Sequence, residues 1–359
     1  MMERIFPDDR YSPLGYHRVM EPAGLLPQAA WRLDNTPVAS PTETLVDVHC
    51  LHIDSASFAQ IAMTCDDNKS QMRSHIQEIV RQRGKMHNPV TGSGGVLLGT
   101  IRHLDEKAGL THGIHVGDAI VSLTSLSWLP LYIERIHEIY LAQAKVEIEG
   151  KAIFFQCNPM TRLPDDLPPE MALAALDVAG APARAFHLAR PGQQVTVLGA
   201  GGTAGLLTIC ALRQRFGTEG KIIAVEQNAK ALQDLVTLDL ADVLVCADAT
   251  KPREVVRQVR EACHPHSYEA DLTINVVNVP HTEPASILLT RPEGHILFFS
   301  MATSFTAAAL GAEGLARRVE MSIGNGYMPD HGVDALQLLR TYPGLFSLFK
   351  QRFCSLASE

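Results

Sequence analysis

The strongest indication of the fold of this chain is the stretch Val195-Thr-Val-Leu-Gly199-Ala-Gly-Gly202-Thr-Ala-Gly205-Leu206. Its apolar start predicts a buried strand, its glycines predict a tight turn, and the apolar residues that follow predict a helix. In such a unit Gly199 permits the turn, Gly202 lets a pyrophosphate approach the backbone, and Gly205 allows the helix to pack closely on the sheet. The free N–H groups and the positive dipole end of the helix favour phosphate. We therefore predict a dinucleotide-binding turn.

The glycines of this turn fit two registers, Gly199-x-Gly201-x-x-Ala204 and Gly199-x-x-Gly202-x-x-Gly205. Both place a glycine-rich turn at the start of a helix, so both predict a dinucleotide fold. The residues expected to contact the cofactor through the turn are Gly199, Ala200, Gly201, Gly202, Thr203, Ala204 and Gly205. A glycine-rich turn without a ligand is the alternative.

A carboxylate follows the next predicted strand, residues 222–225. Glu226 stands where a carboxylate accepts the ribose hydroxyls of NAD and repels the 2′-phosphate of NADP. Gln227 comes next, and no basic residue occurs before Lys230. NAD is therefore the predicted cofactor, and a solvated surface glutamate is the alternative interpretation of Glu226.

From about residue 165, strand-like apolar runs alternate with helical patterns, which predicts a parallel sheet covered by helices on both faces. The predicted strands are residues 195–198, 222–225, 243–246, 272–276 and 296–299. Ligands of such sheets bind at the carboxyl ends of the strands. The further cofactor candidates at those ends are Asp248, Val277, Asn278, Ser300 and Met301. We expect helices to begin at Pro168-Pro169-Glu170 and to occupy residues 333–353.

The first 160 residues indicate a β-rich domain, because short apolar runs are separated by Gly, Pro and Asp turns. One predicted helix interrupts them, with Asp66 and Asp67 at its start and Gly84 after its end. Its apolar stripe consists of Met72, Ile76, Ile79 and Val80. We predict an α/β chain with a β-rich domain over residues 1–160 and a doubly wound domain over 161–327. Helices in 328–359 are expected to pack on the first domain.

The composition is that of a globular enzyme, with 359 residues, 46% hydrophobic and 19% charged. The net charge of −8 and the lack of a basic run argue against a nucleic-acid partner. The first ten residues lack the apolar segment of a signal peptide, and glycines and threonines interrupt the longest uncharged run, so no membrane association is expected. The seven cysteines are dispersed without a Cys-x-x-Cys pair, which favours the cytoplasm.

The domain order and several segments resemble the medium-chain dehydrogenase/reductase superfamily. Leu51-His-Ile-Asp54-Ser55 resembles its catalytic-loop segment, and Gly92-Ser93-Gly94 stands where zinc-containing members have Gly-His-Glu. Val116-Gly-Asp118 resembles its turn before a strand. The resemblance implies a GroES-like β-rich catalytic domain followed by a Rossmann domain, with residues 172–185 as the helix that approaches the nicotinamide. Because either Ile53 or Asp54 stands at the position of the Cys ligand and Ser93 at that of the His ligand, and no cysteine cluster occurs, we expect no metal.

Longer blocks are similar to a narrower family. They are Asn88-Pro-Val-Thr-Gly-Ser-Gly-Gly95, Lys151-Ala-Ile-Phe154, Met171-Ala-Leu-Ala-Ala-Leu-Asp-Val-Ala-Gly-Ala-Pro-Ala183, Asn275-Val-Val-Asn-Val-Pro280, Phe299-Ser-Met-Ala-Thr-Ser-Phe-Thr306 and Ala309-Leu-Gly-Ala-Glu-Gly314. These blocks resemble the L-erythro-3,5-diaminohexanoate dehydrogenases of lysine fermentation over nearly the whole chain. The resemblance implies NAD-dependent oxidation of the substrate's C3 amine, hydrolysis to 5-amino-3-oxohexanoate and ammonium, and a homodimer.

Oxidation of an amine needs a neutral nitrogen rather than a metal, so a carboxylate should accept the proton of the substrate ammonium and activate water. Asp54 lies in the catalytic-loop segment, and Asp177 lies in an apolar helical run, where an unpaired acid is costly. Their alternatives are a turn-stabilising Asx residue and a structural buried acid. Lys85 is the catalytic-site candidate for holding the substrate carboxylate, and a solvated lysine is its alternative.

Other polar residues are expected to line the substrate site: Ser57, His87, Asn88, Ser125, Ser127, Ser304 and Asn325. His87 could equally be structural. A zinc-free NAD(P)H-dependent reductase of quinones or enones is the nearest alternative function; it needs only an apolar pocket and would tolerate loss of Asp54 and Asp177. A protein that binds the nucleotide without catalysis is an alternative of a different class, which turnover of NAD with a diamino acid would exclude.

Overall fold

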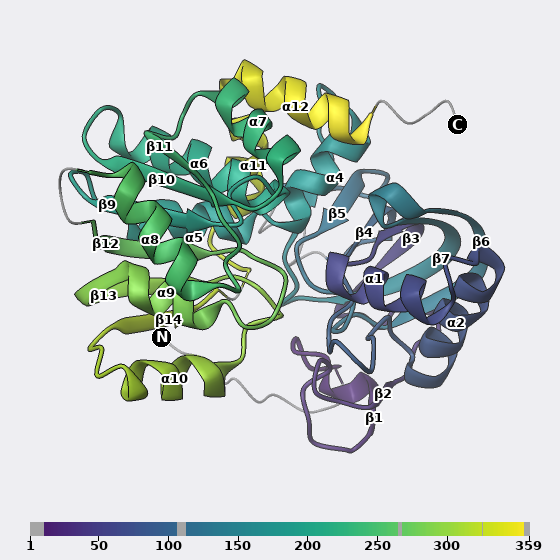
Figure 1. Cartoon of the computed structure of the whole chain (residues 1–359). Coiled ribbons are helices and arrows are strands. Elements are labelled where there is room, and N and C mark those ends of the chain that lie inside the picture. Colours follow the sequence, from purple (N-terminus) through teal and green to yellow (C-terminus); the bar gives the residue numbers. More distant parts are fainter. Residues whose placement is uncertain (1–10, 106–112, 265–267, 325, 355–359) are drawn as a thin grey trace, which may run out of the picture. The chain divides into compact units, whose positions relative to one another are not determined.

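The computed structural model describes residues 11–105, 113–264, 268–324 and 326–354. The chain forms two compact units, Met1–Pro169 and Glu170–Glu359, called unit 1 and unit 2 below (Figure 1). The boundary lies a few residues after the expected one at residue 160. Within the described residues, no helix is long and apolar enough to cross a bilayer.

Unit 1 is built on an antiparallel six-stranded sheet with the order β6-β7-β3-β4-β5-β8. These strands are β3 (Glu43–His52), β4 (Val96–His103), β5 (Ala119–Ser122), β6 (Leu131–Tyr140), β7 (Lys145–Phe155) and β8 (Met160–Arg162). A separate pair consists of β1 (Val19–Glu21) and β2 (Arg32–Leu33). Short 3-10 helices occur at Tyr16–Arg18 and Leu141–Gln143. The β-rich character expected from the sequence is confirmed.

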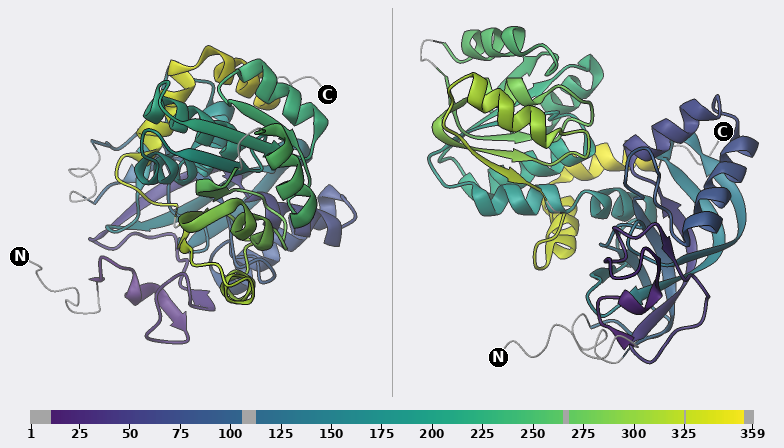
Figure 2. Two further views of the ribbon diagram at one scale, coloured as in Figure 1. Left: turned by 60° about the vertical axis from the view of Figure 1, so that its left-hand side comes forward. Right: turned by 90° about the horizontal axis from the view of Figure 1, so that it is seen from below.

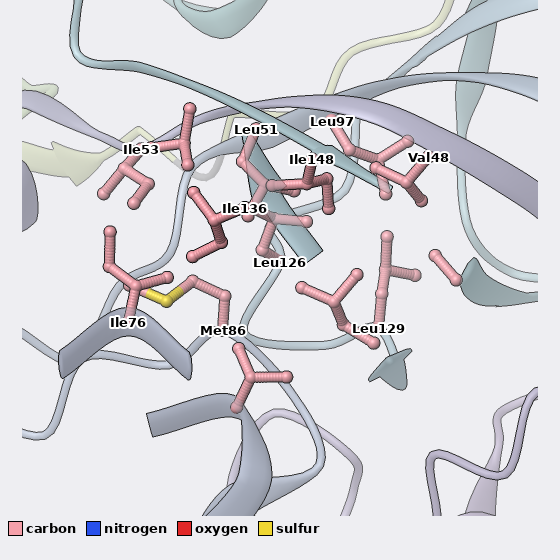
Figure 3. Packing of buried hydrophobic residues seen from close by; sticks show 14 of the residues in the cluster. Val48, Leu51, Ile53, Ile76, Met86, Leu97, Leu126, Leu129, Ile136 and Ile148 are labelled. Atoms are coloured by element: carbon pink, nitrogen blue, oxygen red, sulfur yellow. The ribbon is translucent and has the colours of Figure 1, made fainter. Parts of the chain in front are cut away.

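Two helices, α1 (Ser55–Thr64) and α2 (Lys69–Arg83), complete unit 1. The expected stripe of α2 is buried in the apolar core of unit 1, and Figure 3 shows Ile76 of α2 among the residues of this core. The expected start of α2 is wrong by two residues, because Asp66 and Asp67 have positive φ angles and form the turn after α1. Asn68 instead caps α2 by accepting from two backbone N–H groups.

Unit 2 contains a parallel six-stranded sheet with the order β11-β10-β9-β12-β13-β14. Its strands are β9 (Gln194–Leu198), β10 (Lys221–Glu226), β11 (Val243–Cys246), β12 (Ala270–Asn275), β13 (Thr290–Phe298) and β14 (Glu320–Ile323). This is the doubly wound order, and it reverses direction between β9 and β12, where such sheets bind ligands. The expected Rossmann topology is confirmed. The strand β14 was not predicted, because its four residues mix polar and apolar types.

Helices lie on both faces of this sheet, as Figure 2 shows from two further directions. They are α4 (Pro169–Asp177), α5 (Gly180–Leu188), α6 (Thr203–Phe216), α7 (Ala229–Leu238), α8 (Pro252–Ala262), α9 (Glu283–Leu289), α10 (Phe305–Gly314), α11 (His331–Thr341) and α12 (Pro343–Phe353). The helix expected over residues 172–185 is two helices. Gly180 begins the second, where a Cβ atom would come within 2.5 Å of the backbone of Gly326. Within unit 2, α11 contacts α5 and α6, and α12 contacts α7.

Candidate functional site

The turn after β9 has the geometry that a dinucleotide fingerprint requires. Gly199 has a φ of +79°, in the region that favours glycine. Its N–H and that of Ala200 both donate to the carbonyl of Val225 on β10, over 3.0 and 3.1 Å. A Cβ atom on Gly199 would lie 3.0 Å from Cγ2 of Val277 and 3.2 Å from its backbone nitrogen. A larger residue would therefore strain the turn and push against the loop that follows β12.

The later glycines of the turn have different surroundings. The N-cap of α6 is Gly202, which has no side chain to accept from the first N–H groups of the helix, so within the described part of the chain these groups remain for an anion. Among the described residues, a Cβ atom on Gly202 would approach only the carbonyl oxygen of Gly199, at 3.5 Å. A Cβ atom on Gly205 would lie 2.4 Å from the carbonyl oxygens of Gly199 and Ala200. The helix thus packs on the turn through Gly205, while the open side at Gly202 fits a bound pyrophosphate.

Glu226 is the last residue of β10, and both of its carboxylate oxygens accept hydrogen bonds from backbone. Oε2 accepts from the N–H of Gly201 over 3.0 Å, and Oε1 accepts from the N–H of Asn228 over 2.9 Å. The side chain is half-buried, whereas the neighbouring Gln227 is exposed. The interpretation of Glu226 as a solvated surface residue is therefore wrong. Each oxygen keeps a lone pair with which it can accept a ribose hydroxyl.

The other predicted cofactor residues also follow the carboxyl ends of strands. Asp248 lies after β11, where hydrogen bonds from the side chain and the backbone of Thr250 hold the pKa of its carboxyl below the usual value. Asn278 and Ser300 connect the loops after β12 and β13, because the Ser300 hydroxyl donates to Oδ1 of Asn278 over 3.4 Å. Next to Ser300, Met301 is 67% exposed. These side chains all follow the carboxyl ends of strands of the unit 2 sheet.

Sequence reasoning missed a buried polar network under these two loops. The amide nitrogen of Asn275 donates to Thr282 and Ser286 over 2.8 and 3.0 Å, and its oxygen accepts from the N–H of Val277. Buried Glu283 accepts from the N–H of Ser304 over 2.6 Å. The Ser304 hydroxyl caps α10. The only local signal was Pro284 after Glu283, which is typical of a helix start.

The two carboxylate oxygens of Asp54, in unit 1, have different surroundings. It is the N-cap of α1, and Oδ1 accepts from the N–H of Ser57 over 3.0 Å. The Asx alternative of the sequence analysis therefore describes this oxygen correctly. Oδ2 is buried and has no hydrogen-bond partner among the described residues. A buried acceptor without a partner needs an explanation, and Oδ2 is the atom of Asp54 that could accept a proton.

Lys85 is fully buried, which makes the interpretation as a solvated lysine wrong. Its ammonium group donates to the backbone carbonyls of Pro27 and Gln28 over 2.5 and 2.8 Å. Burial, with a smaller contribution from the positive charge of Arg83, lowers the pKa of Lys85 to about 7. Lys85 thus fastens the loop between β1 and β2 onto unit 1. Because its side chain has no exposed surface, a bound carboxylate would reach it only after this loop moved.

The neighbouring candidates are also engaged within unit 1. His87 is nearly buried, and burial, Arg83 and Lys85 lower its pKa to about 4, so that it is neutral near pH 7. Asn88 is fully buried; it donates to the carbonyl of Ser57 and to Gln60, and accepts from the N–H of Val90. The buried Ser57 hydroxyl contacts that of Thr91 at 2.5 Å. Ser125 and Ser127 share a hydrogen bond of 2.9 Å.

Of the two remaining candidates, the structure describes Asp177 but not Asn325. Asp177 is the last residue of α4 rather than a residue inside a continuous helix, and it is half-buried in unit 2. Asn325 lies outside the described residues. Within the part of the chain that the structure describes, no group of three or more His, Cys, Asp or Glu side chains is arranged to hold a metal ion.

Comparisons with known proteins identify relatives of this chain. Residues 17–164 match the family model of the L-erythro-3,5-diaminohexanoate dehydrogenase N-terminal domain. The chain is 45% identical over 338 residues to an L-erythro-3,5-diaminohexanoate dehydrogenase of Fusobacterium nucleatum, covering 94% of this chain and 97% of the relative. It is 44% identical to the enzyme of the same description from Acetoanaerobium sticklandii, covering 91% of this chain and 94% of the relative.

The fold is similar to that of solved dehydrogenases and related proteins. An alcohol dehydrogenase from Thermotoga maritima, TM0436, superimposes with a TM-score of 0.55 at 13% identity, covering 87% of this chain and 85% of that one. The mycobacterial protein Rv1454c, complexed with NADPH, gives a TM-score of 0.52 at 15% identity, covering 88% and 82%. At such identities the likeness concerns the fold alone. The sequence identity to the curated relatives is decisive, and it shows that the chain belongs to the L-erythro-3,5-diaminohexanoate dehydrogenase family of oxidoreductases.

Proposed function

We propose that this chain catalyses the NAD-dependent oxidative deamination of L-erythro-3,5-diaminohexanoate at C3. The substrate, NAD⁺ and water would give 5-amino-3-oxohexanoate, ammonium, NADH and one proton. The observation that carries the proposal is the 45% identity to the Fusobacterium enzyme over 94% of the chain. The glycine turn of unit 2, with an uncapped helix N-terminus beside Gly202, supports a dinucleotide cofactor.

The choice of NAD rests on Glu226. Its carboxylate lies at the end of β10 and is held toward the glycine turn by the N–H of Gly201. A negative charge there suits free ribose hydroxyls and repels a 2′-phosphate. The fold itself does not select the nucleotide, since Rv1454c, a protein of similar fold, is complexed with NADPH. A bound nicotinamide would supply the hydride acceptor.

The residues of this chain would handle protons and water. An alkylammonium group has a pKa near that of lysine, about 10.4, so it must lose a proton before its lone pair can expel hydride from C3. Asp54 can accept that proton at Oδ2, since Oδ1 is already bound by the N–H of Ser57. The same carboxylate would then activate the water that releases ammonium. Asp177 is the second candidate for this role.

The test is an absorbance assay of NADH formation with purified protein and 3,5-diaminohexanoate, lysine or a simple alcohol as donor. We expect turnover with the 3,5-diamino acid alone, release of ammonium, and no change after incubation with a chelator. Turnover of quinones or enones with NADPH, without oxidation of the diamino acid, would instead establish the reductase function. Tight NADH binding without turnover of any amine or ketone would point to a nucleotide-binding protein without catalysis.

We further propose that the chain acts as a homodimer. On α10 and β14 the side chains of Phe305, Leu310 and Ile323 are 73%, 60% and 65% exposed. β14 is also an edge strand of its sheet, with backbone groups available for pairing. Exposed apolar side chains next to a sheet edge favour association with a second copy. Light scattering coupled to size-exclusion chromatography should give twice the chain mass of 39.2 kDa, and a monomer would refute the proposal.

A further inference from the structure

The glycine turn is held by a residue from the far end of the chain. Arg352 lies one residue before the end of α12, and its Nη1 donates to the carbonyl of Gly201 over 2.9 Å. Its Nη2 forms an ion pair with Asp234 on α7. One planar guanidinium therefore connects the turn after β9 to the helix after β10. Such a bridge needs two separate N–H donors in a fixed geometry, which the planar guanidinium provides.

The helix that carries Arg352 is firmly packed, so the guanidinium is not on a loose tail. Leu345 and Phe349 of α12 are fully buried and Leu348 nearly so. α12 contacts α7, and Phe349 also packs against Phe353 with ring centroids 5.4 Å apart. The side chain of Arg352 itself is 24% exposed. An ion pair at this depth is not a freely solvated surface pair, which would contribute little.

Arg352 completes a closed ring of contacts around the peptide groups of Gly201. The N–H of Gly201 donates to Glu226, whose other oxygen accepts from the N–H of Asn228. Asn228 caps α7, and α7 carries Asp234, the ion-pair partner of Arg352. The ring returns through Arg352 to the carbonyl of Gly201. The turn is thus held on its N–H side by Glu226 and on its carbonyl side by Arg352.

A glycine turn needs such restraint more than other segments do. Glycine loses more conformational freedom on folding than any other residue, so an unrestrained Gly201 could rotate its peptide groups away from the binding geometry. The N–H of Gly202, in the same peptide group as the Gly201 carbonyl, donates to the carbonyl of Gly199 over 3.2 Å. With Arg352 in place, both ends of that peptide group are fixed.

We propose that Arg352 is a positioning residue of the dinucleotide site, so that the last helix of the chain belongs functionally to the nucleotide-binding turn. Arg352 holds the Gly201–Gly202 peptide group in the orientation that leaves the N-terminus of α6 open to a pyrophosphate. This inference rests on the proposed function only for the identity of the nucleotide. It adds a contact between the turn and α12 that the glycine pattern does not contain.

The test compares Arg352→Met, which keeps the aliphatic length, with Arg352→Lys, which keeps the charge and one donor group. The matched control is Arg257→Met on α8, whose guanidinium pairs with Glu261 where both side chains are mostly exposed. The first measurement is amide hydrogen exchange of the peptide covering residues 199–206 in protein without nucleotide. In Arg352→Met we expect about ten-fold faster exchange there, with the rest of the chain unchanged.

The second measurement is the dissociation constant of NADH, followed by fluorescence. We expect it to rise about ten-fold in Arg352→Met, with partial recovery in Arg352→Lys and no change in Arg257→Met. In steady-state kinetics the KM for NAD should rise by a larger factor than kcat falls, because bound nucleotide can itself order the turn. A residue that only stabilised the whole fold would speed exchange throughout unit 2 and lower the melting temperature instead.

Wild-type exchange over residues 199–206 together with wild-type NADH affinity in a folded Arg352→Met protein would overturn the proposal. Its failure is distinguishable from failure of the proposed function. If the diamino acid is not oxidised, the exchange and NADH measurements still report on the turn. If the wild type binds no NADH, the exchange measurement alone decides, since it requires neither substrate nor nucleotide.

Discussion

Replacing Gly205 by alanine should separate the packing of α6 from the binding of the nucleotide. The new Cβ atom would lie 2.4 Å from the carbonyl oxygens of both Gly199 and Ala200, and ordinary van der Waals contact begins at 3.4 Å. Both obstacles are backbone atoms, which cannot rotate aside as a side chain would. The first turn of α6 must therefore retreat by about 1 Å from the turn.

The size of the effect follows from this displacement. N–H groups that would donate to a phosphate near 2.9 Å would then lie close to 4 Å away, beyond hydrogen-bonding range. Hydrogen bonds to a charged group contribute about 1.5–3 kcal/mol each, so losing two should weaken binding by roughly 100-fold to 10,000-fold. The overpacking itself should lower the free energy of unfolding by about 1–3 kcal/mol.

The assay measures NADH affinity by fluorescence titration and the free energy of unfolding in urea. Two alanine variants serve as controls. Gly202→Ala places its Cβ atom at an ordinary contact distance of 3.5 Å from the carbonyl oxygen of Gly199, with an allowed φ of −72°, so the unfolding free energy should fall by at most about 1 kcal/mol while NADH affinity drops. Gly314→Ala, at the end of α10 with no described atom within 4 Å, should change neither quantity.

The reasoning would be refuted by a Gly205→Ala protein that unfolds at the wild-type urea concentration and binds NADH normally. In that case the helix does not depend on this close approach. A Gly202→Ala protein with full NADH affinity would show that the phosphates do not lie against Gly202, and the site would have to be reassigned along the turn.

Four further predictions concern single residues. Asp54→Asn retains the helix cap but not the base, so kcat should fall by about 10²–10⁴ in steady-state kinetics with unchanged urea unfolding. Glu226→Ser should raise the ratio of kcat/KM for NADP to that for NAD at least about ten-fold, because a like charge no longer faces the 2′-phosphate. Burial alone would raise the pKa of Glu43, but hydrogen bonds led by Arg18 lower it from 4.5 to about 2. The ionised carboxylate contributes roughly 3 kcal/mol to the free energy of unfolding, which is fully present above pH 4.5 and is lost as the pH falls through 2. Glu43→Gln should therefore flatten this part of the pH dependence of urea unfolding. The pKa of Lys85 lies near 7 in the folded chain and 10.5 when unfolded, so the unfolded state binds more protons between these values. Stability should therefore rise with pH from 7 to 10.5, and Lys85→Met should remove that rise.

Features that depend on local conformation were predictable from the residues alone. The strand, glycine turn and helix around Gly199 follow from residue order alone, because positive φ angles, apolar periodicity and helix starts are properties of a few neighbouring residues. Glu226 could be found for the same reason, since a residue that ends one parallel strand lies beside the turn that ends the next. The longer blocks of sequence identified the family, because they cover most of the chain.

What those residues contact became known only from the folded structure. Lys85 carries the local signal of a surface lysine, yet carbonyls 57 and 58 residues earlier in the chain bury it. Arg352 meets Gly201 across 151 residues, and β14 is a strand because β13 offers it a pairing edge. Periodicity and motif spacing report the conformation of short segments, whereas these contacts depend on how distant segments pack. For that reason the nucleotide turn was predictable from its own residues, and the groups that hold it in place were not.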